Sequence, residues 1–483
     1  MIKPSGVCRR FIRKIFRVYS KIRHIRHKIS LQLDNFGRWR EAHISERTTV
    51  FILAVLIGLA AGTGAFVLKT MIRYVSTFLT SGFNFMSGNK LLLLLPLLGI
   101  VITGILTRYV MRRDIAHGVA KMKKSLSQGK LYTPPSMMFN PIIASTITLG
   151  FGGSAGSEGP IATAGGAFGA NFARWARLSP QWIAILIGCG AGAGIAGIFK
   201  APIGGAMFTI ELMSLPFTTV GLIALFICTA VAGMTAYTLS GFRIDMPMID
   251  ASAPFDPSLL PFLLALAIAC GFYSLYYNFF MKRVGIWLTK LRNPWVRNII
   301  AGLALSAMIY FFPALYGEGY PVIGKLYNGQ SGALLSDSPF ATAGGGAALL
   351  MLVTAGVLLV KCFATSTTNN GGGVAGDFAP TLFAGGVFGF LFATMLNHYW
   401  GFQLPVGIFV LCGMSGVMAG AIRAPFTAWL LVIEMVSGYS CFMPVFLVAI
   451  ISFAIVRLFT ADGFYQRHLD RPNGLLHRFL HLF

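Results

Sequence analysis

The sequence predicts an all-α, polytopic membrane protein, and two observations carry that prediction. Hydrophobic residues make up 55% of the 483 residues and charged residues only 11%. Long stretches also run with almost no charge, and several reach the length of about 20 apolar residues that a helix needs to cross a bilayer. These stretches are 51–68, 91–107, 181–199, 258–281 and 345–360.

The placement of the basic residues predicts how the chain is oriented. The formal net charge is +24, and Lys and Arg are concentrated in 1–47, 108–130, 282–297 and the C-terminal tail. Basic flanks mark the cytoplasmic side of a membrane protein, so both termini are predicted to be cytoplasmic. The same residues can contact anionic lipid, and this explains the positive charge better than nucleic-acid binding does.

Five regions follow from these patterns, taken in chain order. Residues 1–47 form a basic, amphipathic cytoplasmic region, and 48–240 form a first transmembrane half. Residues 241–257 form an external loop, 258–466 a second transmembrane half, and 467–483 a short cytoplasmic tail.

An internal repeat relates the two transmembrane halves. Residues 156–169 (GSEGPIATAGGAFG) and 376–389 (GDFAPTLFAGGVFG) share two flanking glycines, a proline, Ala-Gly-Gly and a phenylalanine. A second pair follows: 200–211 (KAPIGGAMFTIE) matches 423–434 (RAPFTAWLLVIE). Repeats of this kind are typical of secondary transporters, whose sites lie where Gly and Pro interrupt helices at the repeat interface.

Each repeated Gly-Pro motif predicts a helix that begins inside the membrane. The first N–H groups of such a helix have no intrahelical partner, and together with the helix dipole they attract anions. We therefore expect two helix N-termini, one from each half, to face a shared anion site. Glu158 lies in one motif, and a carboxylate at membrane depth is a functional candidate by default.

The motifs resemble those of the CLC chloride channels and proton/chloride exchangers over about residues 50–466. Gly156-Ser157-Glu158-Gly159-Pro160 is similar to the family's glutamate motif, and Gly376-Asp377-Phe378-Ala379-Pro380 to its second filter motif. Tyr465 stands where the family has a late pore tyrosine. The resemblance implies a CLC-type fold with two inverted-topology halves, in a multi-pass plasma-membrane protein of the bacterial inner-membrane type.

The resemblance also implies roles for particular residues. Glu158 would be the external gating glutamate, which leaves an anion site when it takes up a proton. Chloride would be bound by backbone N–H groups near Phe378 and Ala379, by the Tyr465 hydroxyl, and by His117-Gly118. The protein would be a homodimer with one pore in each subunit and contacts from about 196–240 and 423–458.

Two departures from the family pattern leave the mode of transport open. His117 replaces the family serine, and its imidazole either donates to chloride or turns away. Exchangers usually carry a Glu-Glu pair whose second member relays protons. Here the pair is Glu211-Leu212, so leucine stands at the relay position, and Glu211 has either a structural role, like Glu434 in the repeat, or a functional one. A proton/chloride antiporter and a passive channel are therefore both compatible with the sequence, and fluoride is disfavoured because the filter sequence differs.

Two other kinds of function explain the sequence less well than transport does. Gly152-Gly153-Ser154-Ala155-Gly156 matches G-x-S-x-G, which would suit an intramembrane serine hydrolase, but that alternative leaves the repeat unexplained, as does a scaffold or receptor. The seven cysteines are scattered and show no metal-ligand spacing. We therefore expect no metal, no cofactor and no enzymatic activity.

Overall fold

The computed structural model describes residues 32, 35, 37–80, 93–113, 115, 117–213, 215, 218–243, 256–335, 338–340 and 346–460. The expected N-terminal helix before residue 32, most of the 241–257 loop, the C-terminal tail and Tyr465 lie outside these residues. Within them the secondary structure is helical, which confirms the predicted all-α class, and nine helices are long and apolar enough to cross a membrane.

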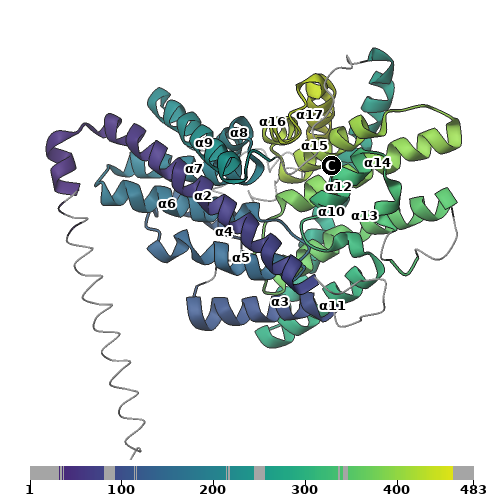
Figure 1. The fold of residues 1–483 in the computed structure, drawn as a ribbon, viewed down its shortest axis with the longest axis horizontal. Coiled ribbons are helices and arrows are strands. Elements are labelled where there is room, and N and C mark those ends of the chain that lie inside the picture. Colours follow the sequence, from purple (N-terminus) through teal and green to yellow (C-terminus); the bar gives the residue numbers. More distant parts are fainter. Residues whose placement is uncertain are drawn as a thin grey trace, which may run out of the picture.

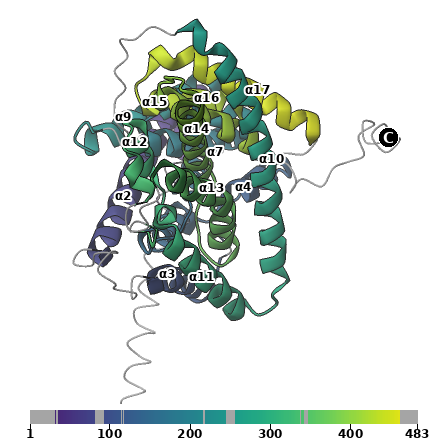
Figure 2. The same ribbon diagram turned by 90° about the vertical axis from the view of Figure 1, so that its right-hand side faces the viewer.

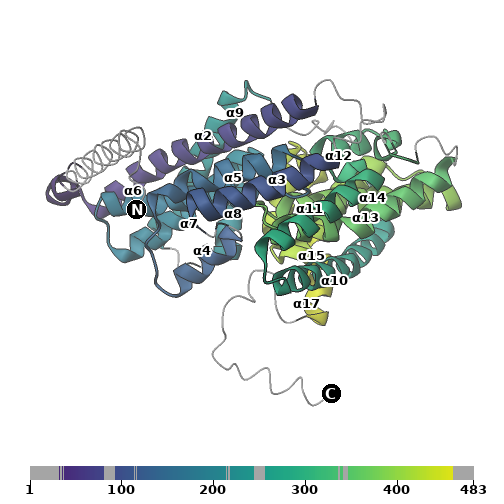
Figure 3. The ribbon, with the colours of Figure 1, turned by 90° about the horizontal axis from the view of Figure 1, so that it is seen from below.

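Two groups of helices lie side by side, one from each part of the chain (Figure 1). The first group contains α2 (Glu46–Thr80), α3 (Leu94–Ile105), α4 (Gly118–Ser127), α5 (Asn140–Gly150), α6 (Glu158–Trp175), α7 (Pro180–Phe199), α8 (Pro202–Met213) and α9 (Thr219–Leu239). The second contains α10 (Leu260–Lys290), α11 (Pro294–Phe311), α12 (Tyr320–Tyr327), α13 (Gly346–Asn370), α14 (Phe378–Trp400), α15 (Val406–Ile422), α16 (Pro425–Met435) and α17 (Phe442–Phe459). The two groups also lie side by side in the view from below (Figure 3).

The repeated motifs form the same structures in both groups. Both filter motifs begin a helix, α6 at Glu158 and α14 at Phe378, with proline in the first turn, where its missing N–H costs no hydrogen bond. The second pair of motifs breaks a helix: α7 ends before Lys200 and α15 before Arg423. Both basic residues take a left-handed backbone, with φ of 57° and 64°.

The shared glycines allow equivalent helix pairs to pack closely. A Cβ added at Gly165 in α6 would lie 2.0 Å from the Gly190 carbonyl oxygen in α7. In the second group, a Cβ at Gly385 in α14 would lie 2.2 Å from the Gly413 carbonyl oxygen in α15. Small residues let membrane helices approach at this range, which gives the repeated Ala-Gly-Gly a packing role.

α10 and α17 run next to each other at the edge of the second group (Figure 2). The two groups meet through α3 and α11, through α8 and α16, and through the starts of α6 and α14. The contacts of α8 with α16 and of α6 with α14 bring together equivalent parts of the repeat.

Candidate functional site

The two filter motifs are joined directly at the starts of α6 and α14. Gly156 N–H donates to the Gly376 carbonyl at 3.0 Å, and Gly376 N–H donates to the Gly156 carbonyl at 2.6 Å. These two bonds form an isolated antiparallel bridge, so the motifs run in opposite directions. The bridge brings the N-termini of α6 and α14 to one place, as expected from the sequence.

Glu158 lies at this junction with none of its surface exposed. Its Oε1 accepts a hydrogen bond from the Tyr320 hydroxyl at 2.9 Å, and the backbone N–H of Ala379 is directed at the same carboxyl group. A Cβ added at Gly156 would lie 1.9 Å from Glu158 Oε2. Glycine at position 156 therefore makes room for the carboxylate as well as for the bridge.

The N-terminus of α4 lies next to α6, one turn along from the junction. A Cβ at Gly118 would lie 2.2 Å from Thr163 Oγ1, so these two helices touch at Gly118. His117 precedes α4 with a left-handed backbone (φ 54°). The starts of α4, α6 and α14 thus gather around one region, where their dipoles add positive potential.

The remaining filter residues are buried except Gly159, which is partly exposed. Phe378 has no exposed surface, and its ring packs on Phe208 of α8 with centroids 5.5 Å apart. Asp377 is 5% exposed and accepts a hydrogen bond from Asn369 Nδ2 at 2.6 Å. Ser157, Gly159, Pro160 and Pro380 lie in the starts of the same two helices.

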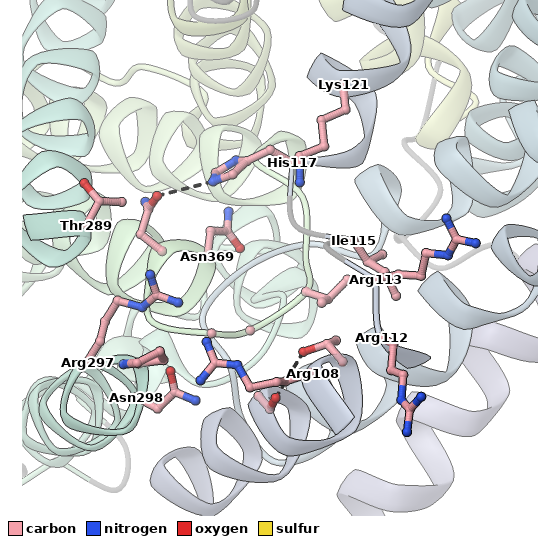
Figure 4. A pocket seen from close by; sticks show the side chains of 17 residues that line it. Arg108, Arg112, Arg113, Ile115, His117, Lys121, Thr289, Arg297, Asn298 and Asn369 are labelled. Carbon is pink, nitrogen blue, oxygen red and sulfur yellow. Dashed lines mark hydrogen bonds between the residues drawn. The ribbon is translucent and has the colours of Figure 1, made fainter. Parts of the chain in front are cut away.

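A cavity of about 500 Å³ opens beside His117 (Figure 4). Its walls come from η3 (Leu106–Met111), the starts of α4 and α11, the end of α13 and residues 372–374. Five cationic side chains line it: Arg108, Arg112, Arg113, Lys121 and Arg297. The described lining residues include no acidic side chain, so the cavity attracts anions.

His117 points its ring into this cavity toward Asn370 (Figure 4). The ring Nε2 donates to Asn370 Oδ1 at 3.3 Å. The imidazole therefore has a protein partner at the cavity wall, and its contact with chloride stays a prediction.

Glu211 and Glu434 make matching contacts across the repeat. Glu211 accepts hydrogen bonds from the backbone N–H groups of Phe426 (3.1 Å) and Thr427 (2.7 Å) at the start of α16. Glu434 accepts them from Ile203 (3.0 Å) and Gly204 (2.7 Å) at the start of α8. Each carboxylate caps the helix of the other half, and Leu212, beside Glu211, is buried.

The sequence reasoning missed three residues near Glu158. Tyr320 is the first residue of α12, Glu318 precedes that helix by two residues, and Lys361 lies in α13 with no exposed surface. Lys361 Nζ donates to Ser154 Oγ at 2.9 Å. A single charge inside an apolar span is itself a functional signal, so Lys361 could have been found; nothing in the sequence places Glu318 and Tyr320 beside Glu158.

The G-x-S-x-G segment does not have the form of a hydrolase site. Ser154 lies in a turn between α5 and α6, whereas the hydrolase elbow joins a strand to a helix. Ser154 and Lys361 are both fully buried. The comparisons with known proteins give the hydrolase no support either.

Known proteins are similar to this chain over most of its length. It is 29% identical over 340 residues to the H(+)/Cl(-) exchange transporter ClcA of Vibrio cholerae serotype O1, covering 67% of each chain. It is 25% identical over 333 residues to the voltage-gated ClC-type chloride channel ClcB of Citrobacter koseri, covering 68% of this chain and 74% of that one.

A solved structure has the same fold. The structure of a slow cyanobacterial Cl−/H+ antiporter matches with a TM-score of 0.72 at 23% identity, over 90% of this chain and 98% of that chain. Residues 98–457 match the family model described as voltage gated chloride channel. This match spans both filter motifs and both broken helices, and the chain therefore belongs to the voltage gated chloride channel (CLC) family as an integral, multi-pass membrane protein.

Proposed function

We propose that the protein transports chloride across the membrane along a path that passes the starts of α4, α6 and α14, with Glu158 as its gate. The observation that carries the proposal is the fully buried Glu158 carboxylate among helix N-termini. An ionised carboxylate satisfies those N–H groups as a tethered anion. Protonation removes its charge and frees the site for chloride. Transport of this kind involves no chemical reaction.

The residues that bind chloride are proposed to lie at the same helix N-termini. Backbone N–H groups near Phe378 and Ala379 donate to the anion, as does Gly118 at the start of α4. The cationic cavity beside His117 supplies anions from one face, because its five positive side chains raise the local anion concentration. Basic segments at 108–130 and 282–297 support a cytoplasmic location for that face and for both termini.

The residues at the family's proton-relay position affect whether chloride transport is coupled to protons. Leu212 carries no proton, and Glu211 is held by three hydrogen bonds from Phe426 and Thr427. Proton exchange through Glu158 then needs a water path from the cavity, whereas passive conduction needs none. The named relatives include one exchanger and one channel.

Anion flux from proteoliposomes tests the proposal. The reversal potential is recorded with a chloride gradient, with and without a pH gradient. A potential that follows chloride alone identifies a channel, and one that also shifts with the pH gradient identifies an exchanger. Absence of chloride flux from folded protein, with empty liposomes as the control, would overturn the proposed function.

A further inference from the structure

A second carboxylate lies next to the gate. Glu318 precedes α12 and is half-buried, and its Oε1 accepts hydrogen bonds from Ser157 N–H at 3.0 Å and from Ser157 Oγ at 2.5 Å. Ser157 directly precedes Glu158. The bonds to Ser157 hold the Glu318 carboxylate near the Glu158 carboxyl group, and two like charges at such close range oppose each other.

The turn at Gly319 positions Glu318 and Tyr320, which contact Ser157 and Glu158. Gly319 has φ of 85°, and a Cβ there would lie 2.3 Å from the Phe383 ring. Glu318 on one side of the turn binds Ser157, and Tyr320 on the other side binds Glu158. The Glu318-Gly319-Tyr320 segment therefore holds the start of α6 at two successive residues.

A buried lysine lies near the same two carboxylates. Lys361 of α13 lies within electrostatic reach of Glu158 and Glu318. Its Nζ donates to Ser154 Oγ and lies 4.6 Å from the centroid of the Phe383 ring, a position that favours a cation. From α2, Lys69 lies over the Tyr320 ring at 5.1 Å. The groups that face the gate are thus Glu318, Tyr320 and Lys361, with Lys69 behind the tyrosine.

We propose that Glu318 and Lys361 are positioning residues that set the pH at which Glu158 takes up its proton. They act with opposite sign: Glu318 favours the protonated gate and Lys361 favours the ionised gate. This inference rests on the proposed function, because it needs Glu158 to control chloride flux. The alternative role for Glu318 is structural, as a cap for the start of α6, and the experiment separates the two.

Glu318→Gln removes the charge but keeps an oxygen that accepts from Ser157 N–H and Oγ. Chloride efflux from proteoliposomes is measured across the pH range, with equal pH on both sides. We expect the midpoint of the flux–pH curve to move to lower pH by about one pH unit, because the ionised gate is no longer opposed by a like charge. If Glu318 only caps the start of α6, no such shift is expected.

Lys361→Met removes the buried positive charge and keeps a side chain of similar length. We expect the midpoint of its flux–pH curve to move to higher pH, opposite in direction to the shift of Glu318→Gln. Lys361→Arg keeps the charge, so its midpoint should stay near that of the wild type. If Lys361→Met does not yield folded protein, the direction of the Glu318→Gln shift alone decides the inference. Asp256→Asn, which removes an exposed carboxylate at the start of the segment that leads into α10, controls for general charge effects and should not move the midpoint.

The outcomes separate this inference from the proposed function. Wild-type flux without pH dependence, or the same pH dependence in Glu158→Gln, overturns the gate itself. If the gate behaves as proposed but Glu318→Gln keeps the wild-type midpoint, only the present inference is wrong. Shifts in the same direction for Glu318→Gln and Lys361→Met overturn it as well, since loss of packing and not charge would then explain both.

Discussion

At the scale of the residue, two charged side chains with no exposed surface, Glu158 and Lys361, lie near each other. The carboxylate is fully buried yet hydrogen-bonded to Tyr320, and a cation and a second carboxylate lie within electrostatic reach. Burial without such partners would cost several kcal/mol. The Tyr320 hydrogen bond favours the ionised carboxylate, whereas the like charge of Glu318 opposes it.

Glu158→Gln should abolish the pH dependence of chloride flux, because the amide is neutral at every pH and keeps nearly the same shape. Flux is measured in proteoliposomes at acidic and alkaline pH. The exposed Asp256→Asn variant should keep the wild-type response. A pH response in Glu158→Gln equal to that of the wild type would falsify the gating role.

His117→Ala should alter anion selectivity more than maximal chloride flux. The ring faces the cationic cavity at the start of α4, where it can discriminate among anions, whereas backbone N–H groups remain to support conduction. Relative permeabilities for chloride, bromide and nitrate, taken from reversal potentials, test this. Identical selectivity in both proteins rules out direct coordination by the imidazole.

At the scale of the element, glycine and carboxylate caps determine how broken helices meet. The Gly156–Gly376 bridge joins α6 to α14, and the Glu211 and Glu434 carboxylates join α8 to α16. Unpaired N–H groups at a buried helix start are costly. Both junctions supply partners from the opposite half of the repeat.

Gly156→Ala should lower the free energy of unfolding by about 1–3 kcal/mol, because its Cβ would overlap the Glu158 carboxylate. Thermal unfolding in detergent measures the loss. Gly332→Ala is the matched control, since a Cβ there meets no atom within 4 Å. Equal stability of the two variants would contradict the close contact at Gly156.

Glu434→Gln and Glu211→Gln should each lower the free energy of unfolding by about 1 kcal/mol, because an amide offers one acceptor oxygen where the carboxylate uses two. The same thermal unfolding assay applies. Glu41→Gln is the control: Glu41 forms a half-exposed ion pair with Arg177 at 3.4 Å, and exposed pairs of this kind contribute little. Losses no larger than that of Glu41→Gln would exclude the capping role.

At the scale of the whole molecule, we propose a homodimer through about 196–240 and 423–458. Both ranges present large apolar side chains, among them Phe226 of α9 at 44% exposure and Phe426 of α16 at 41%. Burial of such side chains against a second copy is one way to cover them, and lipid is the other. Mass measurement in detergent distinguishes the two.

The Phe226→Ala, Phe426→Ala double variant should shift the dimer toward monomer, because it removes apolar contact area from the proposed interface. Phe272→Ala with Phe311→Ala is the matched control, since these side chains are similarly exposed (51% and 50%) but lie outside both ranges. A monomeric wild type would show that the homodimer is wrong.

The sequence by itself determined the helical membrane class, the repeat, the helix starts at the two filter motifs and the burial of Glu158. Apolar length, Gly-Pro placement and an isolated charge are local signals. Only the tertiary structure decided what surrounds that charge. Glu318, Tyr320 and Lys361 come from segments more than 150 residues away along the chain, and α12 and α13 bring them to the start of α6. Such pairings depend on how helices pack across the two halves, and hydropathy and motif spacing carry no information about them.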